Sequence, residues 1–181
     1  MIINFKEITK KLYIQELKNF KNIAVKFLEQ VEKYYLKMRK KLIKRKNHVL
    51  KKFLNNEYET EIRKSDYQFK LSHNQLNYYR ILSSLYQTLF SIWETEIQEY
   101  GNSINYKNCN NDIAELYCVV NVLKHGKGAS LENLKANYKY YLQHHYFDII
   151  SATQSGIIIN ISKTNFIEFC DKIIDIWYHL E

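Results

Sequence analysis

Residues 17–38 read LKNFKNIAVKFLEQVEKYYLKM, and this stretch decides the fold. Its apolar residues recur at alternating steps of three and four, at Leu17, Phe20, Ala24, Phe27, Val31, Tyr34 and Met38. This spacing is the a/d seam of a coiled coil over three heptads, and it predicts a long helix that packs against another helix.

The helix around this seam has room to extend in both directions, because residues 5–54 contain neither Gly nor Pro. A single helix over that range would be about 75 Å long, so part of it would project or pair with another chain. Two helices with a break near Lys46-Asn47-His48 fit the pattern equally well.

Further helices are predicted downstream. Residues 55–66 read as a polar connection, and residues 67–100 as a second helix with an apolar stripe at Leu76, Tyr79, Leu82, Tyr86, Leu89, Trp93 and Ile97. Later helices are predicted from Asp112 to the residue before Gly126, from Leu131 to about Leu142 with Ser130 as N-cap, and from Phe166 to Leu180. Residues 147–161 read as a β-hairpin. The predicted fold is mainly α, a helical bundle with a long, basic, coiled-coil-like N-terminal helix and a small C-terminal β-hairpin.

Charge is distributed unevenly along the 181 residues. Residues 1–64 hold 18 basic and 7 acidic residues, whereas residues 65–181 hold 9 basic and 12 acidic residues. This asymmetry predicts a basic helical arm over 1–64 and a near-neutral helical bundle over 65–181. A basic arm suits nucleic acid, an anionic surface or an acidic partner protein.

The strongest charge cluster lies in residues 38–52, which hold eight basic residues and no acidic one. The basic residues are Arg39, Lys40, Lys41, Lys44, Arg45, Lys46, Lys51 and Lys52. Such a run can neutralise several phosphates and give strongly salt-dependent binding to DNA or RNA. A partner protein with an acidic face fits equally well. A membrane surface ranks third, because the run contains no Trp.

Several classes of protein are disfavoured. The three cysteines, Cys109, Cys118 and Cys170, show no CxxC spacing, and the pair His144-His145 lacks further ligands at metal-binding spacing. We therefore predict neither a metal site nor a cofactor. No stretch approaches 18 uncharged apolar residues and the N-terminus lacks the apolar core of a signal peptide. The expected location is the cytoplasm.

One segment carries residues that suit acid–base chemistry. Asn121 and His125 are four residues apart and share a helix face, Lys124 lies beside them, and a loop with Gly126 and Gly128 follows. Histidine next to an ammonium group can protonate a leaving oxygen and hold a phosphate. Basic residues in a last turn followed by Gly are also the ordinary end of a helix, and this interpretation is favoured. Glu94, beside Trp93 in the second helix, is a second candidate, which would reach the His125 region across a helix pair and orient the imidazole; a solvated Glu beside a core Trp is the favoured interpretation.

Three segments carry a family resemblance. They are Leu89-Phe90-Ser91-Ile92-Trp93-Glu94, the stretch from Val120-Asn121 through Lys124-His125-Gly126 to Ser130, and Ile157–Ser162 leading to Phe166 and Ile176-Trp177. Together they resemble a group of poorly characterised bacterial helical proteins with a WE helix, an NxxKHGxGxS turn and a closing FW segment. More distantly, the middle helix is similar to the HEPN superfamily of defence and toxin–antitoxin systems.

The HEPN resemblance implies a small helical bundle, often a metal-independent ribonuclease with an RNxxxH motif. On this alignment His125 matches the motif's His, Asn121 matches the residue after the Arg, and Val120 occupies the Arg position. Since a member without the Arg is more often a binding relative, the first hypothesis is a non-catalytic interaction subunit of an antiphage or toxin-type complex. The alternative is a HEPN-like ribonuclease with His125 as general acid or base, Lys124 and Asn121 on phosphate, and Glu94 orienting.

Overall fold

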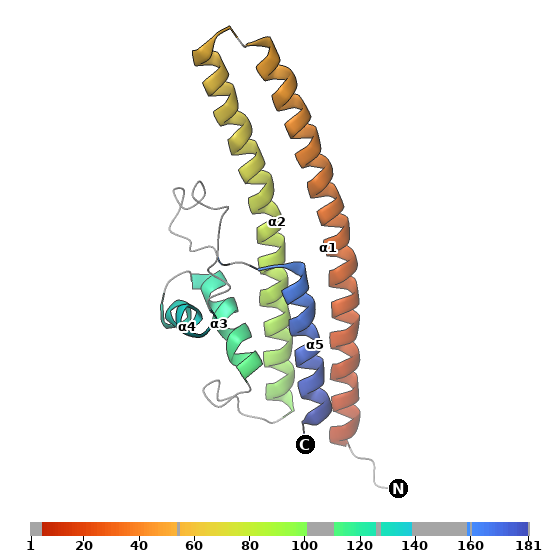
Figure 1. Ribbon diagram of the computed structural model, residues 1–181. Helices are drawn as coiled ribbons and strands as arrows, with labels where there is room; N and C mark the ends of the chain where they lie inside the picture. Colours follow the sequence, from red (N-terminus) through yellow and green to blue (C-terminus); the bar gives the residue numbers. More distant parts are fainter. Residues whose placement is uncertain are drawn as a thin grey trace. The chain divides into compact units, whose positions relative to one another are not determined.

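The computed structural model describes residues 5–53, 55–100, 111–125, 128–138, 159 and 161–180. Within these ranges the chain forms five helices (Figure 1). They are α1 (Phe5–Lys52), α2 (Glu57–Glu99), α3 (Asn111–His125), α4 (Ala129–Asn137) and α5 (Lys163–His179). The mainly helical fold class is therefore confirmed.

The first helix, α1, is one uninterrupted helix of 48 residues. It runs through Lys46-Asn47-His48 without a break, which decides between the two arrangements that the sequence leaves open. No Gly or Pro interrupts its hydrogen-bond ladder, so continuation costs less than a turn would.

The buried seam of α1 differs from the predicted seam at alternate positions. Leu17 and Ala24 are buried as predicted, but Phe27 and Tyr34 are 46% and 63% exposed. Leu28, one residue after Phe27, is fully buried in its place. A seam that advances by three and then four residues shares every seventh position with one that advances by four and then three, and the two seams differ only at the position in between. Packing decides which of the two intervening residues faces the partner helix.

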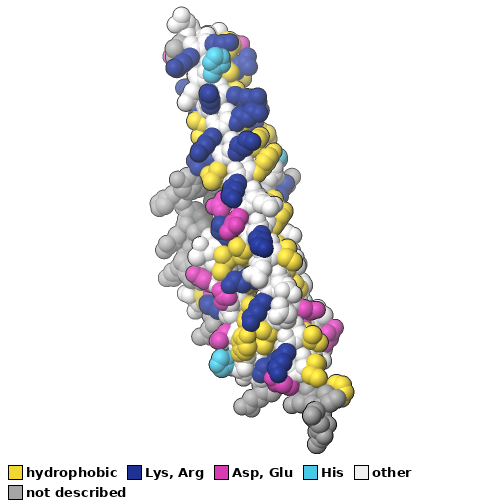
Figure 2. Space-filling view, turned by 90° about the vertical axis from the view of Figure 1, so that its right-hand side faces the viewer, with side chains coloured by type: hydrophobic (Ala, Val, Ile, Leu, Met, Phe, Trp, Pro, Cys, Tyr) yellow, Lys and Arg dark blue, Asp and Glu magenta, His cyan; other side chains and the backbone are white. Residues whose placement is uncertain are grey.

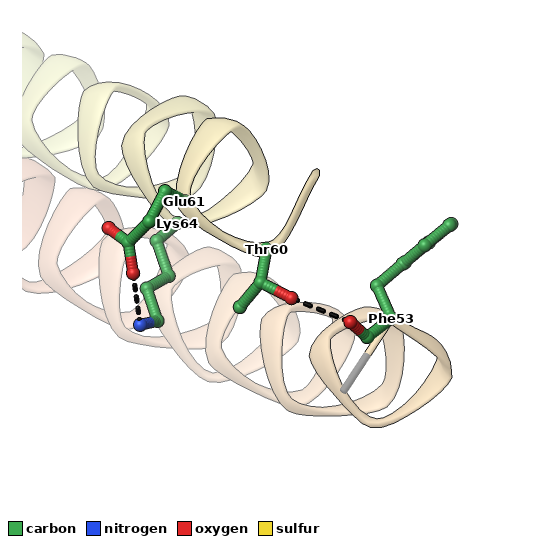
Figure 3. Close-up of polar contacts among 4 residues, drawn as sticks. All are labelled: Phe53, Thr60, Glu61 and Lys64. Carbon is green, nitrogen blue, oxygen red and sulfur yellow. Dashed lines mark hydrogen bonds and ion pairs between the residues drawn. The ribbon is translucent and has the colours of Figure 1, made fainter. Parts of the chain in front are cut away.

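The second helix, α2, begins ten residues before its predicted start, so the polar connection expected at 55–66 is largely helical. The side chain of Asn56 caps the helix by accepting a hydrogen bond from the backbone N–H of Glu59 at 3.1 Å. Thr60 Oγ1 also donates to the carbonyl of Phe53 at 2.7 Å, which ties the start of α2 to the end of α1 (Figure 3). The prediction of a connection at 55–66 was wrong because it relied on polar composition. An Asn N-cap followed by acidic residues is itself typical of the start of a helix.

The chain divides by its packing into two compact units. Unit 1 comprises Met1–Lys26 and Leu82–Glu181, and unit 2 comprises Phe27–Ile81. The division predicted near residue 64 follows charge rather than packing, and as a statement about domains it stays a prediction.

Aromatic side chains from α1, α2 and α5 form the centre of unit 1. Trp177 on α5 is fully buried, and its ring lies 5.1 Å from the ring of Tyr13 and 5.3 Å from that of Tyr100. Phe166 is also fully buried, with the Tyr86 ring 5.5 Å away. Helix α5 therefore supplies the side chains around which α1 and α2 pack in this unit.

Polar contacts hold both ends of α5. Ser162 caps its first turn by accepting a hydrogen bond from the Asn165 N–H at 3.1 Å, and Tyr86 donates to the Ser162 carbonyl at 3.2 Å. Near the C-terminus, Lys10 donates to the Leu180 carbonyl at 2.6 Å. The α5 prediction is thus confirmed to within a few residues at its start.

Two smaller predictions in this unit are corrected. Helix α4 begins at Ala129, directly after Gly128, so Ser130 lies in the first turn and is not the N-cap. Gly128 has φ +126°, a conformation that favours glycine. The helix ends at Asn137 rather than near Leu142, because Tyr138 leaves the helical conformation.

The β-hairpin predicted for 147–161 falls almost wholly outside the described residues. Only Ile159 and Ile161 of its strands are described, and both are buried without belonging to a strand. The described ranges contain no β-strand, so the structure does not support the hairpin.

Unit 2 is formed by the later part of α1 and the earlier part of α2. The rings of Tyr35 and Tyr78 lie 5.5 Å apart, and Asn74 Nδ2 donates to the Tyr35 carbonyl at 3.4 Å. Leu28 is the one residue in the described part of this unit that is buried. Unit 2 is therefore a helical hairpin with a thin apolar interface.

Candidate functional site

The eight basic residues of 38–52, here called the basic segment, all lie on the last part of α1, in unit 2. Seven of them are exposed, and Lys46 is half-buried. Figure 2 faces this side of α1 and shows Lys and Arg side chains gathered over the upper part of the view. Because the helix is uninterrupted, it fixes the spacing of these charges.

Part of the basic segment forms a straight row. Lys40, Lys44 and Lys51 are four and seven residues apart, so successive members return to the same side of the helix. The half-buried Leu42 and Val49 lie on the opposite side. At 1.5 Å per residue the row is about 17 Å long.

The charges of the basic segment are not compensated within the described part of the chain. None of the eight side chains has an acidic partner there, and residues 38–52 contain no Asp or Glu. The ion pairs that the structure gives for unit 2 lie on α2, where Lys64 pairs with Glu61 at 2.5 Å and Lys70 with Asp66 at 2.6 Å. Figure 3 shows the first of these pairs.

The chemistry of the basic segment suits phosphate or carboxylate groups. Uncompensated Lys and Arg side chains on one helix create a positive potential that attracts polyanions. The segment contains no Phe, Tyr or Trp on which a base could stack. Its contacts would therefore go to a backbone rather than to bases, and would carry little sequence preference.

The candidate acid–base residues occupy the end of α3 in unit 1. Asn121 is half-buried, one turn before the exposed His125, and Lys124 is exposed beside it. The helix ends at His125, so Lys124 and His125 both lie in its last turn. A positive charge there interacts favourably with the negative end of the helix dipole. The structure thus brings these three residues together, as the spacing predicts.

The fourth candidate, Glu94, comes from another helix. It is half-buried on α2, next to the buried Trp93. A catalytic role for these side chains stays a prediction.

A buried carboxyl group that the sequence analysis missed lies in the core of unit 1. Glu96 is only 4% exposed, and within the described residues neither of its carboxylate oxygens completes a hydrogen bond of normal geometry. The indole N–H groups of Trp93 and Trp177 are buried and unpaired in the same sense. The sequence held a signal for this burial, because Glu96 lies three residues after Trp93 and next to Ile97, the last residue of the predicted apolar stripe.

Burial changes the acidity of this carboxyl group. Desolvation, followed by repulsion from the Glu16 carboxylate, raises the pKa of Glu96 to about 8, and the Trp177 side chain opposes part of the shift. Glu96 is therefore mainly protonated at neutral pH. Nearby, burial and a 2.9 Å hydrogen bond to Glu99 raise the pKa of Tyr13 to about 12.

The two described cysteines are buried and free. Desolvation raises the pKa of the Cys170 thiol to about 12, and it also raises the pKa of Cys118. Raised pKa values disfavour the thiolate form, so these two side chains act as small apolar residues of the core.

The described ranges hold neither a set of metal ligands nor a membrane-spanning helix. No three His, Cys, Asp or Glu side chains come together there as a set of metal ligands. The pair His144-His145 lies outside those ranges. Of the five helices, none has a stretch sufficiently long and apolar to cross a membrane.

Comparison with protein-family models, with curated proteins and with solved structures gave no match for this chain.

Proposed function

We propose that this protein is a non-catalytic binding subunit that holds a polyanionic partner on the basic segment of α1. The observation that carries the proposal is the uncompensated charge of that segment: seven of its eight basic side chains are exposed, and none of the eight has an ion-pair partner among the described residues. The polyanion that we expect is the phosphate backbone of DNA or RNA, in the cytoplasm. An acidic face of a partner protein is the other candidate.

The energetics favour a salt-sensitive interaction. Each Lys or Arg that contacts a phosphate releases a bound counterion, and the logarithm of the association constant falls with the logarithm of salt concentration by about 0.9 per contact on duplex DNA. An exposed Lys or Arg that is already paired would contribute less to binding, and the eight side chains of the basic segment have no acidic partner among the described residues.

A salt titration tests this proposal. Fluorescence anisotropy with a labelled duplex, a labelled single-stranded RNA and an acidic peptide would give each affinity over a range of salt concentrations. We expect a triple substitution by Gln along the row of α1 to lower the slope of the duplex plot by up to about 3. The three positions are Lys40, Lys44 and Lys51.

A matched control removes three exposed lysines of unit 1, so that the net charge changes equally. These are Lys11, Lys26 and Lys135. The control should keep the wild-type slope. Equal losses in both variants would indicate a net-charge effect and contradict a dedicated site. Binding of the acidic peptide alone would assign the segment to a partner protein.

The assignment to an antiphage or toxin-type complex rests on the HEPN resemblance. Purification of the tagged chain from its source cell, with and without nuclease, would test it. A protein partner that survives nuclease in fixed stoichiometry supports a subunit of a complex. Recovery of nucleic acid alone supports direct nucleic-acid binding.

The ribonuclease alternative is favoured by the placement of His125 and Lys124, which are exposed at the end of α3 with Asn121 one turn earlier. Metal-independent RNA cleavage that disappears in His125→Ala would establish it. Cleavage that persists in this variant would remove the assignment of His125. Glu132→Ala, at an exposed position of α4, is a suitable control.

A further inference from the structure

The outer side of α2 in unit 2 carries an apolar stripe that no described part of the chain covers. Tyr58, Ile62 and Phe69 are 78%, 52% and 67% exposed. They follow one another at steps of four and seven, with the exposed Ser65 between the last two, so they lie on one side of the helix. We call Tyr58, Ile62, Ser65 and Phe69 the α2 stripe.

The α2 stripe lies on the side of the helix that faces away from α1. In this unit α2 contacts α1 through Asn74 and Tyr78. Leu71, which is half-buried, follows Phe69 by two residues, or about 200° of helix rotation. The exposed stripe and the α1 contact therefore occupy opposite sides of the same helix.

Unit 2 is short of buried apolar surface. Apart from Leu28, none of its described side chains is buried. Helical hairpins with so little core are stabilised when further helices pack on them. Exposed apolar stripes of this kind mark interaction surfaces in soluble proteins.

We propose that the α2 stripe is the contact between two copies of this chain, which pack α2 against α2 in antiparallel orientation. The charges beside the stripe point to a second copy, because residues 57–70 hold four acidic and three basic residues. Two such surfaces do not repel each other. The basic segment of α1 would repel its own copy, so contact through that side is disfavoured.

The apolar residues of the α2 stripe are also spaced so that two antiparallel copies of α2 match each other. Ile62 and Phe69 lie at equal sequence distances on either side of Ser65-Asp66. An antiparallel pair centred there sets Ile62 of one copy level with Phe69 of the other, around the small side chain of Ser65.

The ends of the pairing agree with this register. Tyr58 comes level with His73, whose ring already stacks on Phe69 within its own helix at a centroid distance of 6.2 Å. Glu61 comes level with Lys70. A two-fold axis requires one surface to match itself in this manner.

The stoichiometry of the full chain tests this proposal. Analytical ultracentrifugation at micromolar concentration should give twice the chain mass of 21.9 kDa. The double substitution Ile62→Glu and Phe69→Glu should reduce the mass to that of one chain. Both positions are exposed, so helix content by circular dichroism should stay the same.

A matched control places the same two charges on exposed apolar positions of α1 in the same unit. Leu36→Glu and Ile43→Glu, at positions 44% and 39% exposed, should leave the dimer intact. A monomeric wild-type chain would overturn the proposal and leave the stripe to another partner. A dimer that survives the stripe substitutions would overturn it as well.

A cross-link tests the antiparallel register. Ser65→Cys should form a disulfide between copies under diamide, since the two residues lie near the axis. Asn77→Cys should form no such disulfide, because residue 77 lies twelve positions along α2 from Ser65. In an antiparallel pair the two copies of residue 77 lie on opposite sides of the two-fold axis and far from each other. The wild-type chain under diamide gives the background from its native cysteines. Cross-linking at 77 but not at 65 would contradict this register.

Discussion

Unit 1 and unit 2 are built from the same two long helices but differ in what those helices bury. In unit 1, α1 and α2 pack with α5 around fully buried rings such as Trp177 and Phe166. In unit 2 the same two helices continue with Leu28 as the one buried residue among those described, and with exposed charges and rings. Helix formation alone therefore does not make a core, and a third element is needed to enclose apolar side chains.

The largest expected effect is a difference between the two units in the free energy of unfolding lost on truncating an aromatic side chain. Trp177→Ala should lower the free energy of unfolding by about 3–5 kcal/mol, because it leaves a large cavity in unit 1. Tyr34→Ala in unit 2, at a position 63% exposed, should change it by about 0.5 kcal/mol or less. Urea denaturation followed by circular dichroism measures both. Similar losses in the two variants would show that unit 2 has a core of its own.

The next effect concerns the pH dependence of unit 1. The pKa of Glu96 is raised to about 8 in the folded chain, so the folded state binds its proton more tightly than the unfolded state does. The stabilising contribution of this proton is complete below the unfolded pKa of about 4.5, and it is lost as pH rises towards 8. The slope is at most about 1.4 kcal/mol per pH unit.

Glu96→Gln should flatten the stability profile between pH 5 and 8 and give a more stable protein at pH 8. Thermal denaturation at a series of pH values measures the difference. Glu61→Gln, in the exposed ion pair with Lys64 of unit 2, is the control and should keep the wild-type profile over this range. A steep profile that remains in Glu96→Gln would assign it to other groups.

Hydrogen exchange compares the units without a substitution. Backbone amides of α1 after Phe27 and of α2 before Ile81 should exchange at least about tenfold faster than those of α5, because few buried contacts oppose their opening. Mass spectrometry of exchanged peptides gives the rates. If the proposed dimer forms, protection around Ile62 should rise with protein concentration. Equal protection throughout the chain at low concentration would contradict the difference between the units.

The smallest expected effect uses two helix caps. Removing a cap costs about 1 kcal/mol. Ser162→Ala at the start of α5 should lower the stability of the whole of unit 1 by this amount. Asn56→Ala at the start of α2 should destabilise only the first turn of that helix and leave the midpoint of global unfolding unchanged. Denaturation and local hydrogen exchange together distinguish the two outcomes. A global loss in Asn56→Ala would show that the hairpin end contributes to the common folding unit.

Much of the fold follows from the sequence because it depends on local chemistry. The helical spacing from Leu17 onward and the end of the second helix near residue 100 depend on neighbouring residues, and the observed helices α1 and α2 carry these features. The missed start of α2 was local as well, since Asn56 and the acidic residues after it form a recognisable helix start.

The candidate sites were predictable to different degrees. The basic segment can be located in the sequence, because eight charges without an acidic neighbour need no tertiary information. The grouping of Asn121, Lys124 and His125 also follows from their spacing on one helix. The relation of Glu94 to His125 could not be predicted, since it depends on the packing of two separate helices. Burial of Glu96 was only hinted at, because a single charged position in an apolar stripe is often an exposed edge.

The sequence by itself determined that the N-terminal region is helical with a basic end, and that an apolar stripe runs from Leu76 to Ile97 in the second long helix. These features depend on helical periodicity and side-chain charge, which are local properties. Only the tertiary structure decided that α1 is a single helix, that Leu28 rather than Phe27 is buried, that Glu96 is buried and that Ile62 and Phe69 are exposed. The physical reason is that burial is set by which helices pack together, and packing joins residues that are distant in the chain.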